Sequence, residues 1–221
     1  MLAVDVSYKE WPCRYIIKTY VPGEEWAVVR PLMDKQDRSN AYRQMGQAIA
    51  ELHAIRFPGF GELSAEGMVQ PGGSYMAALV ERARQRIHNA RHAELFISLL
   101  KDRAHVFADV SQASLCHEDL HGHNILFDRE QDRWQLAAIL DFDSAWAGHH
   151  ESDLARLELW RGMTGDGFWE AYQARHNLAE AYSQRRLIYQ LMWCLEYGST
   201  TPEHLADTKH VCTALGLPMI L

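Results

Sequence analysis

The sequence predicts an α+β fold in which helices dominate and strands are confined to two short regions. Apolar side chains recur at helical spacing through most of the chain, whereas residues 2–20 and 114–140 contain β-branched and aromatic runs typical of strands. The chain has 221 residues, of which 48% are hydrophobic and 10% are aromatic. This composition is sufficient to bury a sizeable core, and it excludes a mainly disordered protein.

The first predicted elements are two short strands near the N-terminal end. Residues Leu2–Val6 and Arg14–Tyr20 are rich in β-branched and aromatic side chains, which favour extended backbone. Val21-Pro22-Gly23 follows the second run, and the Pro-Gly pair predicts a turn that ends it.

Helical blocks make up most of the remaining chain. One is expected from Ser39, a candidate N-cap, to Arg56, because the apolar side chains at positions 45, 49 and 52 share one face. A loop rich in Gly and Pro separates this block from the next. The loop covers residues 57–73, and the further blocks are expected at about Ser74–Ala90, at about His92–Val110, and from Asp153 onward with breaks at 162–167 and 198–202.

The second strand region lies between these helical blocks. A short strand is expected at Ser114–Cys116, and the apolar runs at 125–128 and 134–140 are expected to pair. The five polar residues between the last two runs are typical of a hairpin loop. The sequence therefore predicts a β-hairpin in the middle of a helical domain.

This hairpin has a geometric consequence for three polar residues. Because a hairpin brings the start of its first strand beside the end of its second, Asn124 and Asp141 are expected to lie together, near the polar loop that contains Asp119. Magnesium prefers oxygen ligands and usually takes one or two carboxylates, which suits Asn124 and Asp141. A carboxylate outside the coordination shell, such as Asp119, could accept a proton from an attacking hydroxyl. The pattern predicts a phosphoryl-transfer site.

Charge and cysteine content narrow the class of protein. Lys and Arg number 22 against 29 Asp and Glu, a formal net charge of −7, which argues against a nucleic-acid partner. The four cysteines are scattered without a CxxC pair, which favours reduced thiols and a cytoplasmic protein. The N-terminal segment lacks the basic start of a signal peptide, and no stretch approaches the ~18 apolar residues of a membrane helix. We therefore expect no membrane association.

Several motifs resemble one known enzyme family. Residues 117–124 (HEDLHGHN) and 141–143 (DFD) are similar to the catalytic loop HGDLHxxN and the later D-(aromatic)-(acid) segment of the aminoglycoside phosphotransferase-like family of small-molecule kinases. Residues 16–23 (IIKTYVPG) resemble the interlobe hinge of that family. Residues 45–61 resemble its first helix after the hinge, and residues 151–155 resemble the start of a later helix.

The resemblance implies a protein-kinase-like fold with a truncated small β lobe and a mainly α-helical large lobe that contains the catalytic β-hairpin. Residues 1–22 would be the remnant of the N-terminal lobe and the hinge. Residues 23–221 would form the helical C-terminal lobe with the catalytic loop and the metal site. The implied reaction is the magnesium-dependent transfer of the γ-phosphate of ATP or GTP to a hydroxyl of an aminoglycoside, an amino alcohol or a sugar-like molecule.

The resemblance also implies roles for individual residues. Asp119 would be the catalytic base or the carboxylate that positions the hydroxyl, and Asn124 and Asp141 would hold Mg²⁺ against the nucleotide phosphates. Backbone groups of Thr19 and Val21 would contact the adenine edge. Supporting roles would fall to His117, Asp143 and Asp153.

The sequence departs from the family pattern at two places. Glu118 replaces the usual Gly beside the catalytic Asp, and a position facing solvent would make this charge harmless. Residues 1–22 contain no match to the glycine-rich phosphate loop, the strand lysine or the helix glutamate. The short strands would then form a small sheet with an exposed apolar face, for which a second copy of the chain is the expected partner.

Other interpretations of the same residues stay open at this point. The chain could be a degenerate, non-catalytic kinase-like binding protein. Residues 117–121 (HEDLH) also match HExxH, a zinc-peptidase signature that requires a helix. His149-His150 is expected to be a surface pair. The acidic side chains of Glu151, Glu158, Asp166 and Glu170 fit either attraction of a cationic acceptor or an ordinary solvated helix face.

Overall fold

The computed structural model describes residues 3–69, 73–198 and 201–219. Short 3-10 helices lie at Arg30–Leu32 and Ala104–Phe107. The strands are β1 (Ala3–Asp5), β2 (Tyr15–Ile17), β3 (Glu24–Glu25), β4 (Arg56–Phe57), β5 (Gly61–Glu62), β6 (Ala113–Cys116), β7 (Ile125–Glu130), β8 (Arg133–Ile139) and β9 (Trp146–Gly148). The helices are α1 (Trp26–Val29), α2 (Lys35–His53), α3 (Tyr75–Arg86), α4 (Ala90–Asp102), α5 (Glu151–Leu159), α6 (Phe168–Gln173), α7 (Tyr182–Tyr197) and α8 (Pro202–Leu215).

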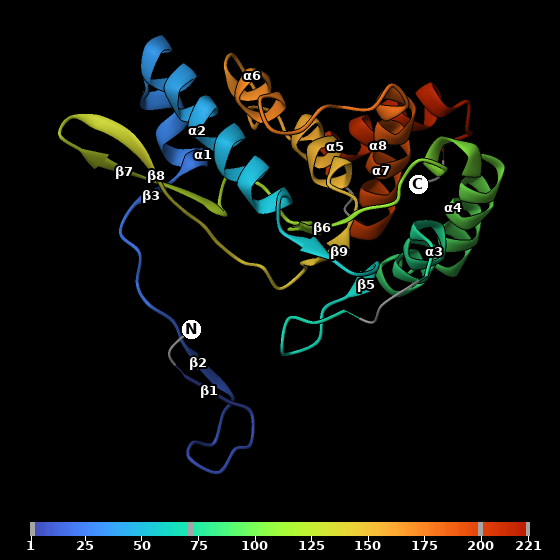
Figure 1. Ribbon diagram of the computed structural model, residues 1–221, viewed down its shortest axis with the longest axis horizontal. Coiled ribbons are helices and arrows are strands. Elements are labelled where there is room, and N and C mark those ends of the chain that lie inside the picture. The colour runs from blue at the N-terminus through green and yellow to red at the C-terminus, as the bar shows by residue number, and fades with distance from the viewer. Residues whose placement is uncertain (1–2, 70–72, 199–200, 220–221) are drawn as a thin grey trace.

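The helices form two groups with small sheets between them and beside them. Helices α3, α4, α7 and α8 gather on one side in Figure 1, and α2 and α6 lie on the other. The larger hydrophobic clusters follow this division, because one joins α3, α4, α7 and α8 and another joins α1, α2, α5, α6 and β7. Close approach of α2 and α6 requires Gly46, where an added Cβ would lie 2.4 Å from the carbonyl oxygen of Phe168.

The N-terminal strands form a hairpin of their own. Strands β1 and β2 pair antiparallel as a two-stranded sheet, which projects from the body in Figure 1. The predicted start of the first strand, Leu2, lies outside the described residues. Large apolar side chains on this hairpin are exposed, among them Val4 at 55% and Ile16 at 50%. The expected exposed apolar face of the small sheet is therefore present.

Helix α2 starts earlier and ends earlier than the sequence predicts. Its N-cap is Asp34, whose side chain accepts a hydrogen bond from Asp37 N at 2.8 Å, and not Ser39. Its first turns are polar and contain no apolar period, so the hydrophobic pattern could not reveal them. The helix ends at His53, and Arg56 belongs to β4.

The segment predicted as a loop at 57–73 contributes edge strands. Strands β4 and β5 complete a four-stranded sheet in the order β4-β6-β9-β5. Two-residue strands carry too little pattern to be recognised, since their pairing depends on distant partners. Residues 70–72 of this predicted loop lie outside the described part of the chain. Beyond the loop, Ser74 caps α3 as the first residue of the predicted helical block.

The central hairpin is present, with a tighter turn than expected. Strands β7 and β8 pair antiparallel from Ile125–Ile139 to Glu130–Arg133, and β3 adds to the outer edge of β7. Gln131 and Asp132 alone form the turn, with positive φ angles of 47° and 61°. The prediction of a five-residue loop was wrong because the polar residues on both sides of the turn continue the strands on a solvated surface.

The later helices show both predicted breaks and one that was not predicted, at residues 174–181 between α6 and α7. Helix α7 ends at Gly198, which adopts the left-handed conformation with φ 56°. Residues 199–200 of the predicted break lie outside the described part. In the described residues, no helix is long and apolar enough to cross a membrane. Cys13 is exposed, and the other cysteines are buried.

Candidate active site

The hairpin brings the three predicted polar residues to one place. Leu140 N donates to the backbone oxygen of Asn124 at 2.8 Å, so Asp141, the next residue, begins beside Asn124. The side chain of Asn124 reaches back to the preceding loop, where its Nδ2 lies 3.0 Å from the backbone oxygen of Asp119 and 3.3 Å from Asp119 Oδ2. The backbone of Asp141 therefore lies next to Asn124, whose side chain contacts Asp119, as the predicted hairpin requires.

His117 connects the catalytic loop to the end of the hairpin. Its Nδ1 accepts from Asp119 N at 3.1 Å, so its Nε2 carries the proton and donates to the backbone oxygen of Leu140 at 2.8 Å. The ring also packs on Phe142, with 4.4 Å between ring centroids. Since the ring is fully buried and both nitrogens are used, His117 braces the loop and is not available for chemistry.

Asp153 fixes the start of the loop from the first turn of α5. Its carboxylate accepts from His117 N and Glu118 N, both at 2.7 Å, and from His53 Nε2 at 3.0 Å. Complete burial opposes the charge on Asp153, but the hydrogen bond from His53 and the backbone donors hold its pKa below the ordinary value. A buried, ionised carboxylate thus sets the backbone direction at the catalytic loop.

Asp119 is the open acid of the loop. Its side chain is 38% exposed, and His121 Nε2 and Arg156 Nη1 lie 3.7 and 3.8 Å from its carboxylate oxygens. The interaction with His121 lowers the pKa of Asp119 most, burial opposes this, and the charge of Arg156 adds to the lowering. Asp119 is therefore ionised at neutral pH and can accept a hydrogen bond from a hydroxyl.

Glu118 does not face solvent. Its side chain is 7% exposed and accepts hydrogen bonds from Trp146 Nε1 at 3.2 Å and from the hydroxyl of Ser152, while Arg156 Nη2 lies 3.8 Å away. Its backbone has a positive φ of 63°, a conformation in which Gly is least strained. The conformation explains a Gly at this place, and the buried partners explain how a Glu is tolerated here.

The donor atoms at the hairpin end fit a magnesium ion. Among the described residues, the hydrogen bonds of the Asn124 side chain use its nitrogen, so the amide oxygen is the atom left to bind a cation. Asp141 is exposed and adopts a positive φ of 63°. No described residue pairs with the carboxylates of Asp141 or Asp143, and Asp143 is also exposed. Two oxygen donors with further positions open to water and phosphate are what Mg²⁺ requires.

The predicted nucleotide contacts lie on a separate segment. Thr19 is exposed and Val21 is half-buried, in the irregular stretch between β2 and β3. Strand β3 pairs with β7, so this stretch enters the body beside the hairpin.

The zinc-peptidase interpretation of residues 117–121 is wrong. These residues form no helix, since they lie in the irregular segment between β6 and β7. HExxH chemistry needs two histidines one helical turn apart with free nitrogens. Both nitrogens of His117 are already hydrogen-bonded within the protein.

A cavity opens beside Asp119 on the side of α5 and α7. It has a volume of about 530 Å³, within the range of small-molecule sites. Asp119 lines it, and Asn124 and Asp141 do not. Its other lining side chains include the aromatic rings of Trp26, Trp160, Trp193 and Tyr197.

Comparison with known proteins identifies the family. A family model described as "Phosphotransferase enzyme family" matches residues 3–188, which is most of the chain. The chain belongs to this phosphotransferase family. The family resemblance seen in the sequence motifs is thereby confirmed. No curated protein matches the sequence.

Solved structures similar to this family member are small-molecule kinases. A candidate fructosamine-3-kinase from Thermobifida fusca is 21% identical, with a TM-score of 0.56 over 80% of this chain and 64% of that chain. Aminoglycoside phosphotransferase APH(4)-Ia is 17% identical, with a TM-score of 0.55 over 89% and 69%. An ethanolamine kinase from Plasmodium vivax is 14% identical, with a TM-score of 0.50 over 92% and 66%. The kinase-like α+β fold is confirmed, and the phosphotransferase chain spans less than two thirds of the first of these structures.

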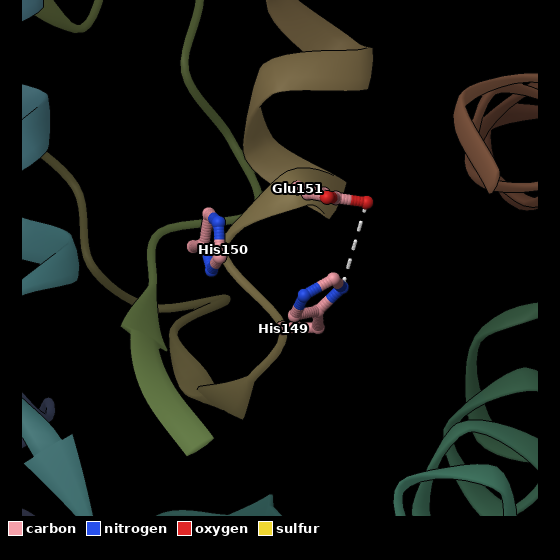
Figure 2. Close-up of side chains that lie close together, drawn as sticks. All are labelled: His149, His150 and Glu151. Atoms are coloured by element: carbon pink, nitrogen blue, oxygen red, sulfur yellow. Dashed lines mark ion pairs between the residues drawn. The ribbon is translucent and has the colours of Figure 1, made fainter. Parts of the chain in front are cut away.

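A second group of polar side chains lies at the start of α5 in the phosphotransferase chain. Figure 2 shows this histidine cluster, which we define as His149, His150 and Glu151. The expectation of a surface pair was wrong, because His149 is 6% exposed and the ring nitrogens of His150 are buried, with no hydrogen-bond partner among the described residues. Both oxygens of Glu151 accept from Arg185, at 2.6 and 2.9 Å. The carboxylate is therefore occupied and unsuited to a metal.

One residue near the site escaped the sequence analysis. Arg156 is 5% exposed, and its guanidinium lies within 4 Å of carboxylate oxygens of Glu118, Asp119 and Glu196. Its position three residues after Asp153, on the same face of a predicted helix, is the signal that could have revealed it.

Proposed function

We propose that this phosphotransferase is a magnesium-dependent small-molecule kinase that transfers the γ-phosphate of ATP or GTP to a hydroxyl group. The observation that carries the proposal is the gathering of Asp119, Asn124 and Asp141 at one end of the β7–β8 hairpin, in a chain of this family. The open Asp119 supplies an ionised carboxylate. The amide oxygen of Asn124 and the carboxylate of Asp141, which no described residue pairs with, supply the donors for a metal.

The proposed chemical step uses each of these groups once. The hydroxyl oxygen of the acceptor attacks the γ-phosphorus, the bond from that phosphorus to the β–γ bridging oxygen breaks, and the nucleoside diphosphate leaves. Asp119 orients the hydroxyl and accepts its proton. Bound magnesium would neutralise charge on the phosphates. His117 and Asp153 keep Asp119 in place, because they tie its loop to the hairpin and to α5.

The similar structures support a nucleotide and a small-molecule partner. A thermostable mutant of APH(4)-Ia was solved as a ternary complex with AMP-PNP and hygromycin B. For this chain we propose a nucleotide bound next to Asn124 and Asp141, with the adenine edge at the backbone of Thr19 and Val21. The acceptor would be an aminoglycoside, an amino alcohol or a sugar-like molecule, bound in the cavity beside Asp119.

Two aspartates of one hairpin give a matched test. Asp141 and Asp132 are both exposed, both adopt positive φ, and lie at opposite ends of the hairpin. Asn tolerates this conformation, so Asp141→Asn and Asp132→Asn change charge with little strain. Calorimetry should show nucleotide binding that requires Mg²⁺, weakens about tenfold or more in Asp141→Asn and is unchanged in Asp132→Asn. Equal binding with and without chelator would contradict the proposal. ATP and GTP are to be compared in the same titrations.

Turnover separates the kinase from a second candidate, a non-catalytic nucleotide-binding protein. This second candidate is favoured by one observation, that Glu118 stands beside Asp119 where the family motif has Gly. Release of ADP with a panel of hydroxylated amines and sugars, abolished in Asp119→Asn, supports the enzyme. Magnesium-dependent binding without turnover supports the binding protein.

We also propose that the N-terminal hairpin is covered by a second copy of the chain. Exposed apolar side chains gather on and beside its two strands, with Trp11 at 63% and Ile17 at 49% exposure. A self-complementary pairing of two hairpins would bury them. Light scattering should show a dimer that Ile17→Lys converts to a monomer. A wild-type monomer at micromolar concentration would contradict this proposal.

A further inference from the structure

The charge of the cavity beside Asp119 is opposite to that expected for a cationic acceptor. Asp119 is the one acidic side chain among its lining residues in the described part of the chain, whereas Arg30 and Arg161 are both lining residues. The carboxylate of Asp119 is already faced by His121 and Arg156. A cationic acceptor would therefore meet two further positive charges and little free negative charge.

The two arginines are not neutralised by neighbouring acids. Among the described residues, neither Arg30 nor Arg161 forms an ion pair or a side-chain hydrogen bond. The guanidinium of Arg30 packs against the backbone of Gly162, where an added Cβ would lie 2.5 Å from its Cζ. Arg30 is half-buried and Arg161 is exposed, so both can turn donors toward a ligand. Paired donors of this kind bind carboxylate or phosphate oxygens.

The acids that could attract a cation lie elsewhere and are occupied. Glu196 pairs with Arg86 and with Arg156. Glu158 accepts from Arg186 at 2.5 Å, and Glu151 accepts from Arg185. None of these acids lines the cavity, and neither do Asp166 and Glu170. Their presence in the sequence therefore does not make the acceptor site acidic.

The aromatic wall of the cavity, which we define as Trp160, Trp193 and Tyr197, offers an apolar face mainly through Tyr197, which is 61% exposed. Trp193 is buried beneath it, with Tyr197 stacked on its ring at 5.5 Å and Trp160 edge-on at 5.0 Å between ring centroids. Such faces receive the C–H face of a sugar ring or a planar group. Asn124 and Asp141, the proposed metal donors, do not line the cavity. The cavity is therefore assigned to the acceptor and not to the nucleotide phosphates.

We propose that the acceptor is a hydroxylated, sugar-sized molecule with an anionic group, whose oxygens bind Arg30 and Arg161 while its ring lies on the aromatic wall and one hydroxyl reaches Asp119. This inference rests on the proposed function for the identity of the cavity as the acceptor site. It differs from that proposal in excluding polycationic acceptors.

Four sugars that differ mainly in charge test the proposal: glucuronate, glucose 6-phosphate, glucose and glucosamine. Calorimetry without nucleotide should give tighter binding for one or both anionic sugars than for glucose, and weakest binding for glucosamine. The two anionic probes distinguish a carboxylate from a phosphate site. Arg30→Gln and Arg161→Gln should each weaken anion binding about fivefold, with little effect on glucose.

Arg129→Gln is the matched control. Arg129 is also exposed and lies over a tryptophan ring, 5.8 Å from the centroid of Trp134, at the far end of the hairpin. It should leave all four affinities unchanged. Equal or tighter binding of glucosamine, absence of anion binding at millimolar concentration, or an anion preference that survives both cavity substitutions would overturn the proposal.

The binding test is independent of phosphoryl transfer. Arginine-dependent binding of an anionic sugar without ADP formation would support the anionic binding site in the cavity and count against the proposed kinase activity. Magnesium-dependent phosphorylation of a cationic acceptor, with no binding of anionic sugars, would support the proposed kinase activity and overturn this inference.

Discussion

The catalytic loop and the histidine cluster contain the same kinds of side chain and differ in which atoms remain free. At the loop, Asp119 is 38% exposed, and Asp141 has no described partner. In the histidine cluster, both oxygens of Glu151 are held by Arg185, and His149 Nδ1 is 2.9 Å from the hydroxyl of Tyr189. Proximity of acids and histidines is therefore not sufficient for a binding or catalytic site. Such a site also needs side-chain atoms that are accessible to a ligand.

Asp153 follows the histidine cluster in the sequence, but its carboxylate interacts with the catalytic loop. Its carboxylate is fully buried, yet it faces the backbone of the catalytic loop. The buried carboxylates of Asp153 and Glu118 position the loop that carries the open acid Asp119. Substitutions in the catalytic loop and in the histidine cluster can test this difference between accessible acids and acids held by partners.

The largest effect is expected when the open acid is removed. Asp119→Asn should lower kcat about 10³-fold and leave the thermal midpoint nearly unchanged, because the side chain is partly exposed and its shape is kept. The matched variant is Glu118→Gln, which should destabilise the fold more and lower kcat less, since its acid is buried among partners. Steady-state kinetics and thermal melts check both variants. A folded Glu118→Gln with the larger loss of kcat would reverse the assignment.

In the histidine cluster, the largest effect on stability should come from removing Arg185, the partner of Glu151. Arg185→Met leaves a buried carboxylate without its partner and should lower the free energy of unfolding by about 3–5 kcal/mol. Arg185 also donates to the backbone of Val106, so part of the loss arises there. Denaturant titration measures it.

The double variant Arg185→Met/Glu151→Leu should recover much of that stability, because no charge is left unpaired. A loss below about 1 kcal/mol in the single variant would show that the ion pair does not hold this region together.

A smaller effect is expected at the residue between the regions. Asp153→Asn keeps the shape but turns an amide nitrogen toward two backbone donors, and should cost about 2–3 kcal/mol of unfolding free energy. The lowered pKa of Asp153 means that its contribution is present above the pKa of the unfolded state, ~3.9, and is lost as the pH falls further.

Denaturant titrations at neutral and acid pH test the Asp153 prediction. The difference between wild type and Asp153→Asn should shrink toward pH ~3. A difference that does not change with pH would indicate that the charge of Asp153 contributes nothing.

The sequence was sufficient to predict the fold class and the strand pairing on which the candidate site depends. A polar turn between two apolar runs predicts a hairpin, and antiparallel pairing alone places Asn124 beside Asp141. Those relations are local or nearly so. The boundaries of α2 and the two-residue turn were missed because solvated residues carry no apolar period.

The surroundings of the site depend on contacts between distant segments. Glu118 is buried because Trp146 and Ser152 pack over it, and His149 is buried against Tyr189 of α7. Nothing in the residues next to Glu118 or His149 reports those partners. A sequence therefore shows which acids are present, and packing decides which of them are open.

The smallest effect near neutral pH is expected at His150 in the histidine cluster. Desolvation, assisted by His53 and His176, lowers its pKa from 6.5 to about 3. Arg56 of β4 and Arg185 of α7 act in the same direction, and the neighbouring His149 has a lowered pKa for the same main reason. The folded state resists a proton that the unfolded state accepts, so stability falls as the pH decreases below about 6.5.

Removing the imidazole of His150 should weaken the dependence of stability on pH. His150→Gln should reduce the slope of unfolding free energy against pH by up to about 1.4 kcal/mol per unit between roughly pH 4 and pH 6. His149 and His176 keep the remaining slope, since their pKa values are also lowered. His88→Gln, at an exposed position after α3, should leave the slope unchanged. If both variants keep the wild-type slope, His150 is protonated in the folded state and the histidine cluster is more open than its packing indicates.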